Sequence, residues 1–208
     1  MDLLRTTSLE EYSESYHDFA DKRTILGIPN MMDTVSNVFG VFPIIYLYAL
    51  VKRKYVSVLI LLLIIQRIAS VRYQLRPSED SLMLDMLSIV TIYNVLLLML
   101  TRTPHVFWVY GLSLASVFYW RYSLNFVPYI AIGGLVIMYT FMKVHKYKPL
   151  RIYLYIALGF IILSRISEHS DDYIYDVTNQ QLSGQTLKHV LTSVVLMMIV
   201  IIIQKTPH

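Results

Sequence analysis

The sequence predicts an all-α integral membrane protein, a seven-transmembrane helix bundle that follows a short acidic N-terminal segment. Three observations carry this prediction. First, 56% of the 208 residues are hydrophobic, 15% are charged and the mean hydropathy is +0.53, whereas about 25% of the residues of a soluble domain are charged. Second, seven apolar stretches reach or approach the roughly 20 residues that a helix needs to cross a bilayer. Third, the segments between these stretches are too short for a second domain.

The predicted spans divide the chain into an N-terminal polar segment, residues 1–29, and a membrane domain, residues 30–208. The spans cover residues 30–51, 55–73, 81–100, 106–120, 126–144, 149–166 and 186–203. The N-terminal segment is rich in Asp and Glu, whereas targeting peptides are poor in acidic residues, so it is not expected to be one. The absence of cysteine excludes a disulfide framework, a thiol nucleophile and a thiolate metal site.

The distribution of basic residues predicts the orientation in the membrane. Nine Lys and Arg residues fall in the loops after the first, third and fifth spans and in the C-terminal tail, against five on the opposite side. The nine are Lys52, Arg53, Lys54, Arg102, Lys143, Lys146, Lys148, Arg151 and Lys205. The positive-inside rule therefore places the N-terminus outside or in a lumen and the C-terminus inside. The net charge of +4 is attributed to this topology and not to nucleic-acid binding, and the membrane is left open between ER or Golgi, bacterial inner and mitochondrial inner.

Polar residues recur every three or four positions in four of the spans, so each set lies on one helical face. The sets are Asp33, Asn37 and Gly40; Gln66, Ser70 and Gln74; Asp85 and Ser88; and Gln185, His189 and Ser193. With the N-terminus outside, all four sets converge on the outer side, next to the acidic residues of the N-terminal segment and of the last loop. Such groups either join helices by hydrogen bonds or line a functional cavity. For Asp18 and Asp21, solvated acids near a helix start are the plain alternative.

Several segments of the chain resemble the alkaline ceramidase family, especially its bacterial-type branch. Residues 17–23 (HDFADKR), 27–30 (GIPN) and 33–37 (DTVSN) resemble the opening of that family. Residues 183–189 (SGQTLKH) resemble its S-G-H-T-L-K-H segment, and residues 73–77 (YQLRP), followed by Asp85, resemble its Y-H-x-x-P … D segment. Glu168 and Asp171 resemble an acidic pair near the end of its sixth span. The resemblance touches the first three spans and the last two.

The resemblance implies a seven-span hydrolase of linear amides that cuts ceramide at a zinc ion held by three histidines. At the matching positions, His189 is one metal ligand, Asp85 orients or deprotonates the zinc-bound water, and Ser70 steadies the ligands or the developing oxyanion. The resemblance also implies a calcium site, for which the matching residues are Asp18, Asp21 and Asn30.

The sequence departs from the family at two of the three zinc ligands, where Gln74 and Gln185 replace histidines. A glutamine carbonyl is a far weaker zinc ligand than imidazole. We therefore expect a ceramidase-like protein without zinc hydrolysis, with no cofactor unless the zinc or calcium site survives. Its expected role is structural, lipid-binding or accessory, and its partners are membrane lipids, either sphingolipid or phospholipid, and other membrane subunits.

Two other functions stay open at this point. One is an active lipid amidase with an altered metal site, for example one built from His17, His169, His189 and Asp85. The other is a seven-span receptor or transporter, which ranks last because no pair of spans is broken by Gly and Pro in matching halves.

Two predictions about the structure follow. Asp18, Asp21, Asp33 and the last loop should lie at one end of the bundle, away from Lys146 and the basic residues at positions 52–54. In addition, Gln74, Asp85, Gln185 and His189 should converge within one cavity.

Overall fold

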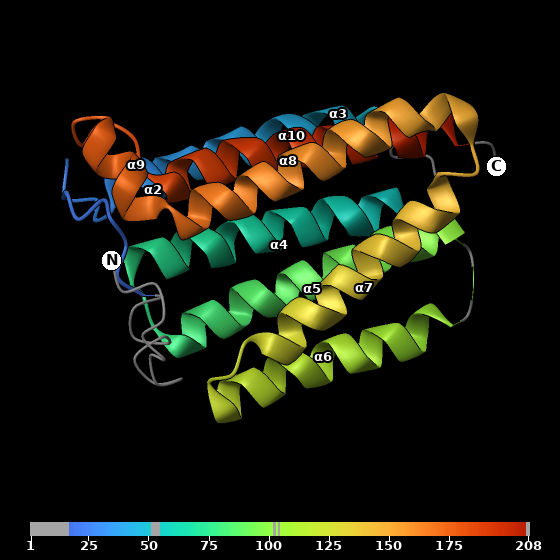
Figure 1. Ribbon diagram of the computed structural model, residues 1–208, viewed down its shortest axis with the longest axis horizontal. Helices are drawn as coiled ribbons and strands as arrows, with labels where there is room; N and C mark the ends of the chain where they lie inside the picture. The colour runs from blue at the N-terminus through green and yellow to red at the C-terminus, as the bar shows by residue number, and fades with distance from the viewer. Residues whose placement is uncertain (1–16, 51–54, 102, 104, 207–208) are drawn as a thin grey trace, which may run out of the picture.

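The computed structural model describes residues 17–50, 55–101, 103 and 105–206 of the chain, and these residues fold into a bundle of helices (Figure 1). The elements are α2 (Met31–Ser36), η1 (Asn37–Gly40), α3 (Val41–Tyr48), α4 (Val56–Leu75), α5 (Glu79–Thr101), α6 (Val106–Ser123), α7 (Val127–Val144), η2 (Lys148–Leu150), α8 (Arg151–His169), α9 (Asp171–Val177) and α10 (Gly184–Lys205). The predicted all-α class is therefore confirmed.

Six segments of the described chain are long and apolar enough to cross a membrane. They are Met31–Tyr48, Val56–Leu75, Glu79–Thr101, Val127–Val144, Lys148–His169 and Gly184–Lys205. This is the pattern of a multi-pass membrane protein. The predicted span over residues 106–120 corresponds to α6, which is not among the six because Ser113, Ser116 and Arg121 make it less apolar than its neighbours.

The long helices pack side by side and alternate in direction (Figure 1). Helix α10 packs along α8 and also contacts α2, η1 and α3, while α4 packs on α5, and α5 in turn contacts α6 and α7. Because α10 packs against both the first span and α8, it brings together segments that are more than 100 residues apart in the chain.

The first span is interrupted, which its uniform hydropathy does not predict. The chain passes from α2 through the 3₁₀ turn η1 into α3. The Asn37 side-chain Nδ2 donates to the carbonyl oxygens of Asp33, at 3.2 Å, and of Thr34, at 3.3 Å. A side chain that satisfies nearby carbonyls competes with the regular helical ladder, so the helix tightens at this point.

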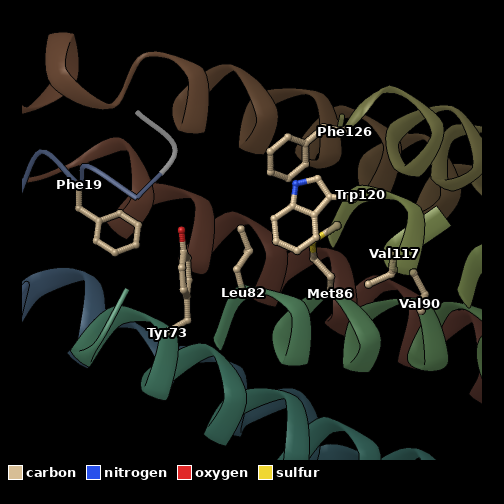
Figure 2. Packing of buried hydrophobic residues seen from close by; sticks show 8 residues of the cluster. All are labelled: Phe19, Tyr73, Leu82, Met86, Val90, Val117, Trp120 and Phe126. Carbon is tan, nitrogen blue, oxygen red and sulfur yellow. The ribbon is translucent and has the colours of Figure 1, made fainter. Parts of the chain in front are cut away.

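One apolar cluster fastens the N-terminal segment to the bundle (Figure 2). It consists of Phe19, Tyr73, Leu82, Met86, Val90, Val117, Trp120 and Phe126. The rings of Phe19 and Tyr73 meet edge to face at 5.3 Å between centroids, which is a favourable aromatic geometry. The chain before the first span is thereby held against α4, α5 and α6.

The end of the bundle that carries α9 also carries the acidic residues, as predicted. Asp21 accepts a hydrogen bond from the Tyr175 hydroxyl of α9 at 3.5 Å, and Asp33 accepts one from Ser183. The loop that contains Lys146 lies at the opposite end, with the C-terminus (Figure 1). Lys52, Arg53, Lys54 and Arg102 and the acidic residues before position 17 lie outside the described residues, so this part of the topology prediction stays a prediction.

Candidate functional site

The polar site is centred on Asp33, a buried carboxylate of α2 that holds the N-terminus of α10. Ser183 caps α10 by accepting from the Thr186 backbone N–H at 2.9 Å, and its hydroxyl donates to Asp33 Oδ1. The Thr186 hydroxyl donates to the same oxygen at 2.8 Å. A helix N-terminus also favours a negative charge. Asp33, Ser183 and Thr186 thus join the first span to the last.

His189, one turn further along α10, is buried and bonded to α2 by its Nδ1 atom. Nδ1 lies 2.7 Å from Ser36 Oγ and 3.1 Å from the carbonyl oxygen of Asp33. Ser36 donates its hydroxyl hydrogen to that same carbonyl at 2.8 Å, so both partners of Nδ1 act as acceptors. Nδ1 therefore carries the proton, and the Nε2 atom of the neutral ring keeps its lone pair. This is the tautomer that a metal-ligating histidine adopts when a carbonyl orients it.

Gln185 belongs to an ionic network with Lys188 and Glu168. Its Oε1 accepts from Lys188 Nζ at 3.0 Å, and the same ammonium pairs with Glu168 Oε1 at 2.5 Å. The other oxygen of Glu168 pairs with Arg165 Nη1 at 2.6 Å. The Gln185 oxygen is thus held by an internal cation.

Asp85, the expected catalytic carboxylate, accepts from Gln66 Nε2 of α4 at 3.0 Å. On α10, Lys188 Nζ contacts Gln185, which lies four residues before His189. That these side chains and Gln74 enclose one cavity stays a prediction.

Gln74 and Ser70 lie one turn apart on the buried face of α4. The Asn30 side-chain Nδ2 donates to the backbone carbonyl of Gln74 at 2.7 Å, which ties the start of the first span to the end of the second. In the described part of the chain, the Gln74 Oε1 atom is buried without a hydrogen-bond partner. A buried carbonyl oxygen in this state is costly and is ready to accept from a donor or a cation.

The three residues matched to a calcium site have separate partners. Asp18 is exposed and forms an ion pair with Lys22 at 2.8 Å, whereas Asp21 is buried. Asp21 accepts from Arg23 Nε at 2.6 Å and, through its other oxygen, from the Met32 N–H at 2.8 Å. Although burial alone would raise the pKa of the Asp21 carboxyl, these hydrogen bonds hold it below its ordinary value.

Asp171, at the start of α9, joins the N-terminal segment to α10. Its two oxygens accept from the backbone N–H groups of Ala20, at 2.9 Å, and Gln185, at 2.8 Å. Burial raises the pKa of this carboxyl, and the two hydrogen bonds oppose the shift. Gly184 permits this approach, because a Cβ atom at that position would collide with the Ser167 carbonyl oxygen and the Asp171 Cα.

The donor set does not fit a three-ligand zinc site. Among the described residues, no group of three or more His, Cys, Asp or Glu side chains is placed to hold a metal ion. The alternative set that includes His17 and His169 is not assembled either: His17 Nδ1 lies 3.1 Å from the Tyr73 hydroxyl, and His169 is exposed.

Ser36 and Thr186 were missed as members of the site, whereas Asp171 was expected among the clustered acidic residues. Ser36 lies three residues after Asp33, and Thr186 three after Ser183, so helical spacing could have included both. Asp171 lies at the α9 end with the other acidic residues, as expected, but its two backbone partners depend on the tertiary fold.

The fold and this site define an all-helical multi-pass membrane protein with a buried polar cluster at one end. No protein-family model matches the chain, and neither a curated protein nor a solved structure matches it.

Proposed function

We propose that the chain is a seven-span membrane protein of the alkaline ceramidase type that has lost zinc hydrolysis. In this proposal α6 is the remaining span, and the protein binds membrane lipid as a structural or accessory subunit of a membrane complex. The N-terminus lies outside and the C-terminus inside.

One observation supports the proposed loss of hydrolysis: Gln185, at the position of a family zinc ligand, is hydrogen-bonded to another side chain of the protein. Gln185 Oε1 accepts from Lys188, which is neutralised by Glu168. A single imidazole, His189, with neutral glutamine oxygens makes a poor zinc site, because such sites rely on nitrogen, sulfur or carboxylate ligands.

The experiment is zinc titration of purified protein in detergent, comparing the wild type with Gln74→His/Gln185→His. The double variant should bind about one zinc ion, because the orientation of His189 by Ser36 and the Asp33 carbonyl is already in place. A matched control is Gln74→His/Gln181→His, which has the same composition but adds its second histidine at an exposed loop position. Equal zinc binding by the wild type and the double variant would refute the proposal.

The alternative is an active lipid amidase, which is favoured by the free lone pair expected on His189 Nε2 and by the retained Asp85. It predicts zinc near one equivalent in the wild type and ceramide hydrolysis that is abolished by Asp85→Asn. The accessory role predicts stoichiometric partner subunits after purification in mild detergent, whereas purification as a clean monomer would contradict it.

A further inference from the structure

A groove runs along the outside of the bundle where the first span meets α4. Its volume is about 990 Å³. One wall comes from α2, η1 and the start of α3, the other from α4, and the floor at one end from the turn before α5. The wall residues Val35, Val38, Val41 and Ile68 are apolar and exposed, and both walls belong to helices long enough to cross a membrane. In a bilayer these apolar walls would face the acyl chains.

Three arginines, Arg67, Arg72 and Arg76, line this apolar groove. In the described part of the chain none of them forms an ion pair. The other described bases at this end of the bundle do so: they are Lys22, Arg23, Arg121, Arg165 and Lys188. The Asp85 carboxylate accepts from Gln66, and in the described chain no ion pair joins it to Arg67. The groove thus carries an excess of positive charge.

The deep end of the groove is built around the Arg67 side chain. The described contacts leave its Nε atom buried without a hydrogen-bond acceptor, and Asn37 Oδ1, on the opposite wall, buried without a donor. Gly40 makes room for the guanidinium, since a Cβ atom on residue 40 would overlap Arg67 Nε and Cζ. A buried donor and a buried acceptor on facing walls indicate a ligand that has both an anionic oxygen and a hydroxyl or N–H group.

We propose that this groove binds one anionic phospholipid, with its phosphate at the arginines and an acyl chain along the valine and isoleucine walls. Arg67 and Arg76 are nine residues apart, or about 14 Å along the helix axis, so the arginines extend from the end of α4 into the bilayer. Guanidinium groups form bidentate hydrogen bonds with phosphate. The apolar walls favour a lipid over free phosphate. This inference rests on the lipid-binding part of the proposed function.

The experiment is native mass spectrometry of the purified full chain in detergent with added phosphatidylglycerol or phosphatidylcholine. The wild type should retain one phosphatidylglycerol and bind it at least tenfold more tightly than phosphatidylcholine. Arg67→Gln should reduce phosphatidylglycerol affinity roughly tenfold or more, because it removes charge-assisted hydrogen bonds. The matched control Arg121→Gln lies outside the groove and is paired with Glu79 and Asp80, so it should leave lipid binding unchanged.

A second variant, Val38→Trp, fills the groove without removing charge, and it should also weaken phosphatidylglycerol binding. Equal affinity for the two lipids, equal effects of Arg67→Gln and Arg121→Gln, or unchanged binding by Val38→Trp would each overturn the inference. Displacement of the lipid by millimolar inorganic phosphate would overturn it as well, in favour of a free-anion site. The zinc titration is independent of these measurements. Zinc bound to the wild type would refute the proposed loss of hydrolysis, whereas a lack of lipid selectivity would refute only the phospholipid site in the groove.

Discussion

Asp33 should contribute more to stability than any other polar residue of the site, because it connects the first and last spans. Its Oδ1 accepts hydrogen bonds from Ser183 and Thr186. Hydrogen bonds between membrane helices contribute about 0.6 kcal/mol on average and at most about 1.7 kcal/mol. Two bonds to a carboxylate lie toward the upper end of that range. Asp33→Ala should therefore lower the free energy of unfolding by about 2–3 kcal/mol.

Asp33→Asn separates the loss of charge from the loss of the acceptor. The amide oxygen can still accept from both hydroxyls, and the new amide nitrogen takes the place of Oδ2, which has no hydrogen-bond partner in the described structure. We expect this variant to cost about 1 kcal/mol.

A matched pair of threonines on α10 supplies the control. Thr186→Val removes one donor to Asp33 and should cost about 1–2 kcal/mol. Thr192→Val makes the same chemical change, but the Thr192 hydroxyl donates only to the carbonyls of Lys188 and His189 in its own helix. It should therefore change the unfolding free energy by less than about 0.5 kcal/mol.

The assay is equilibrium unfolding in mixed micelles of increasing SDS fraction, followed by far-UV circular dichroism. The reasoning is refuted if Asp33→Ala costs less than about 0.5 kcal/mol, or if the two valine variants are equally stable.

Two further predictions use the same assay. Gly184→Ala should lower the free energy of unfolding by about 2–3 kcal/mol, because the added Cβ meets the rigid backbone of Ser167. The control Gly159→Ala has open space around its Cβ and should be neutral or stabilising. Equal effects of the two substitutions would contradict the close approach of α8 and α10. Asp21 has a lowered pKa because of Arg23 and the Met32 N–H, so its stabilisation is complete above about pH 4 and is lost as the pH falls through the lower folded value. Asp21→Asn should have a lower free energy of unfolding than the wild type at pH 7, and the two values should converge in acid. A difference that does not change with pH would show that titration of the Asp21 carboxyl does not affect stability.

The helices could be predicted because their signal is local. A stretch such as Glu79–Thr101 is apolar over a length that only a membrane-spanning helix explains, and the prediction of residues 81–100 differs from it only at the ends. Helix α9 could not be predicted in this way. Its sequence is short and polar, and its position depends on Asp171 accepting from Ala20 and Gln185, which are distant in the chain.

The polar faces of the spans could be predicted, but the pairs they form could not. Asp33, Gln74 and His189 are buried, as their spacing indicated. Helical spacing gives the direction of a side chain but not the identity of the residue opposite. The spacing of Gln185 and His189 placed both on one face of the last span, but it did not indicate that the Gln185 oxygen accepts from Lys188.

The pairing of charges at the α9 end separates two kinds of polar group. Glu168 there forms an ion pair with Lys188, and Asp33 accepts hydrogen bonds at the N-terminus of α10, so these two carboxylates hold the bundle together. The arginines of the groove have no counterpart of this kind in the described chain, and an uncompensated guanidinium beside acyl chains is costly unless an anion accompanies it. The same bilayer that makes an unpaired Arg67 unfavourable contains phosphate-bearing lipids within reach of Arg76. The proposed lipid binding is therefore a consequence of the positive charge of the groove arginines, which no carboxylate of the described chain neutralises.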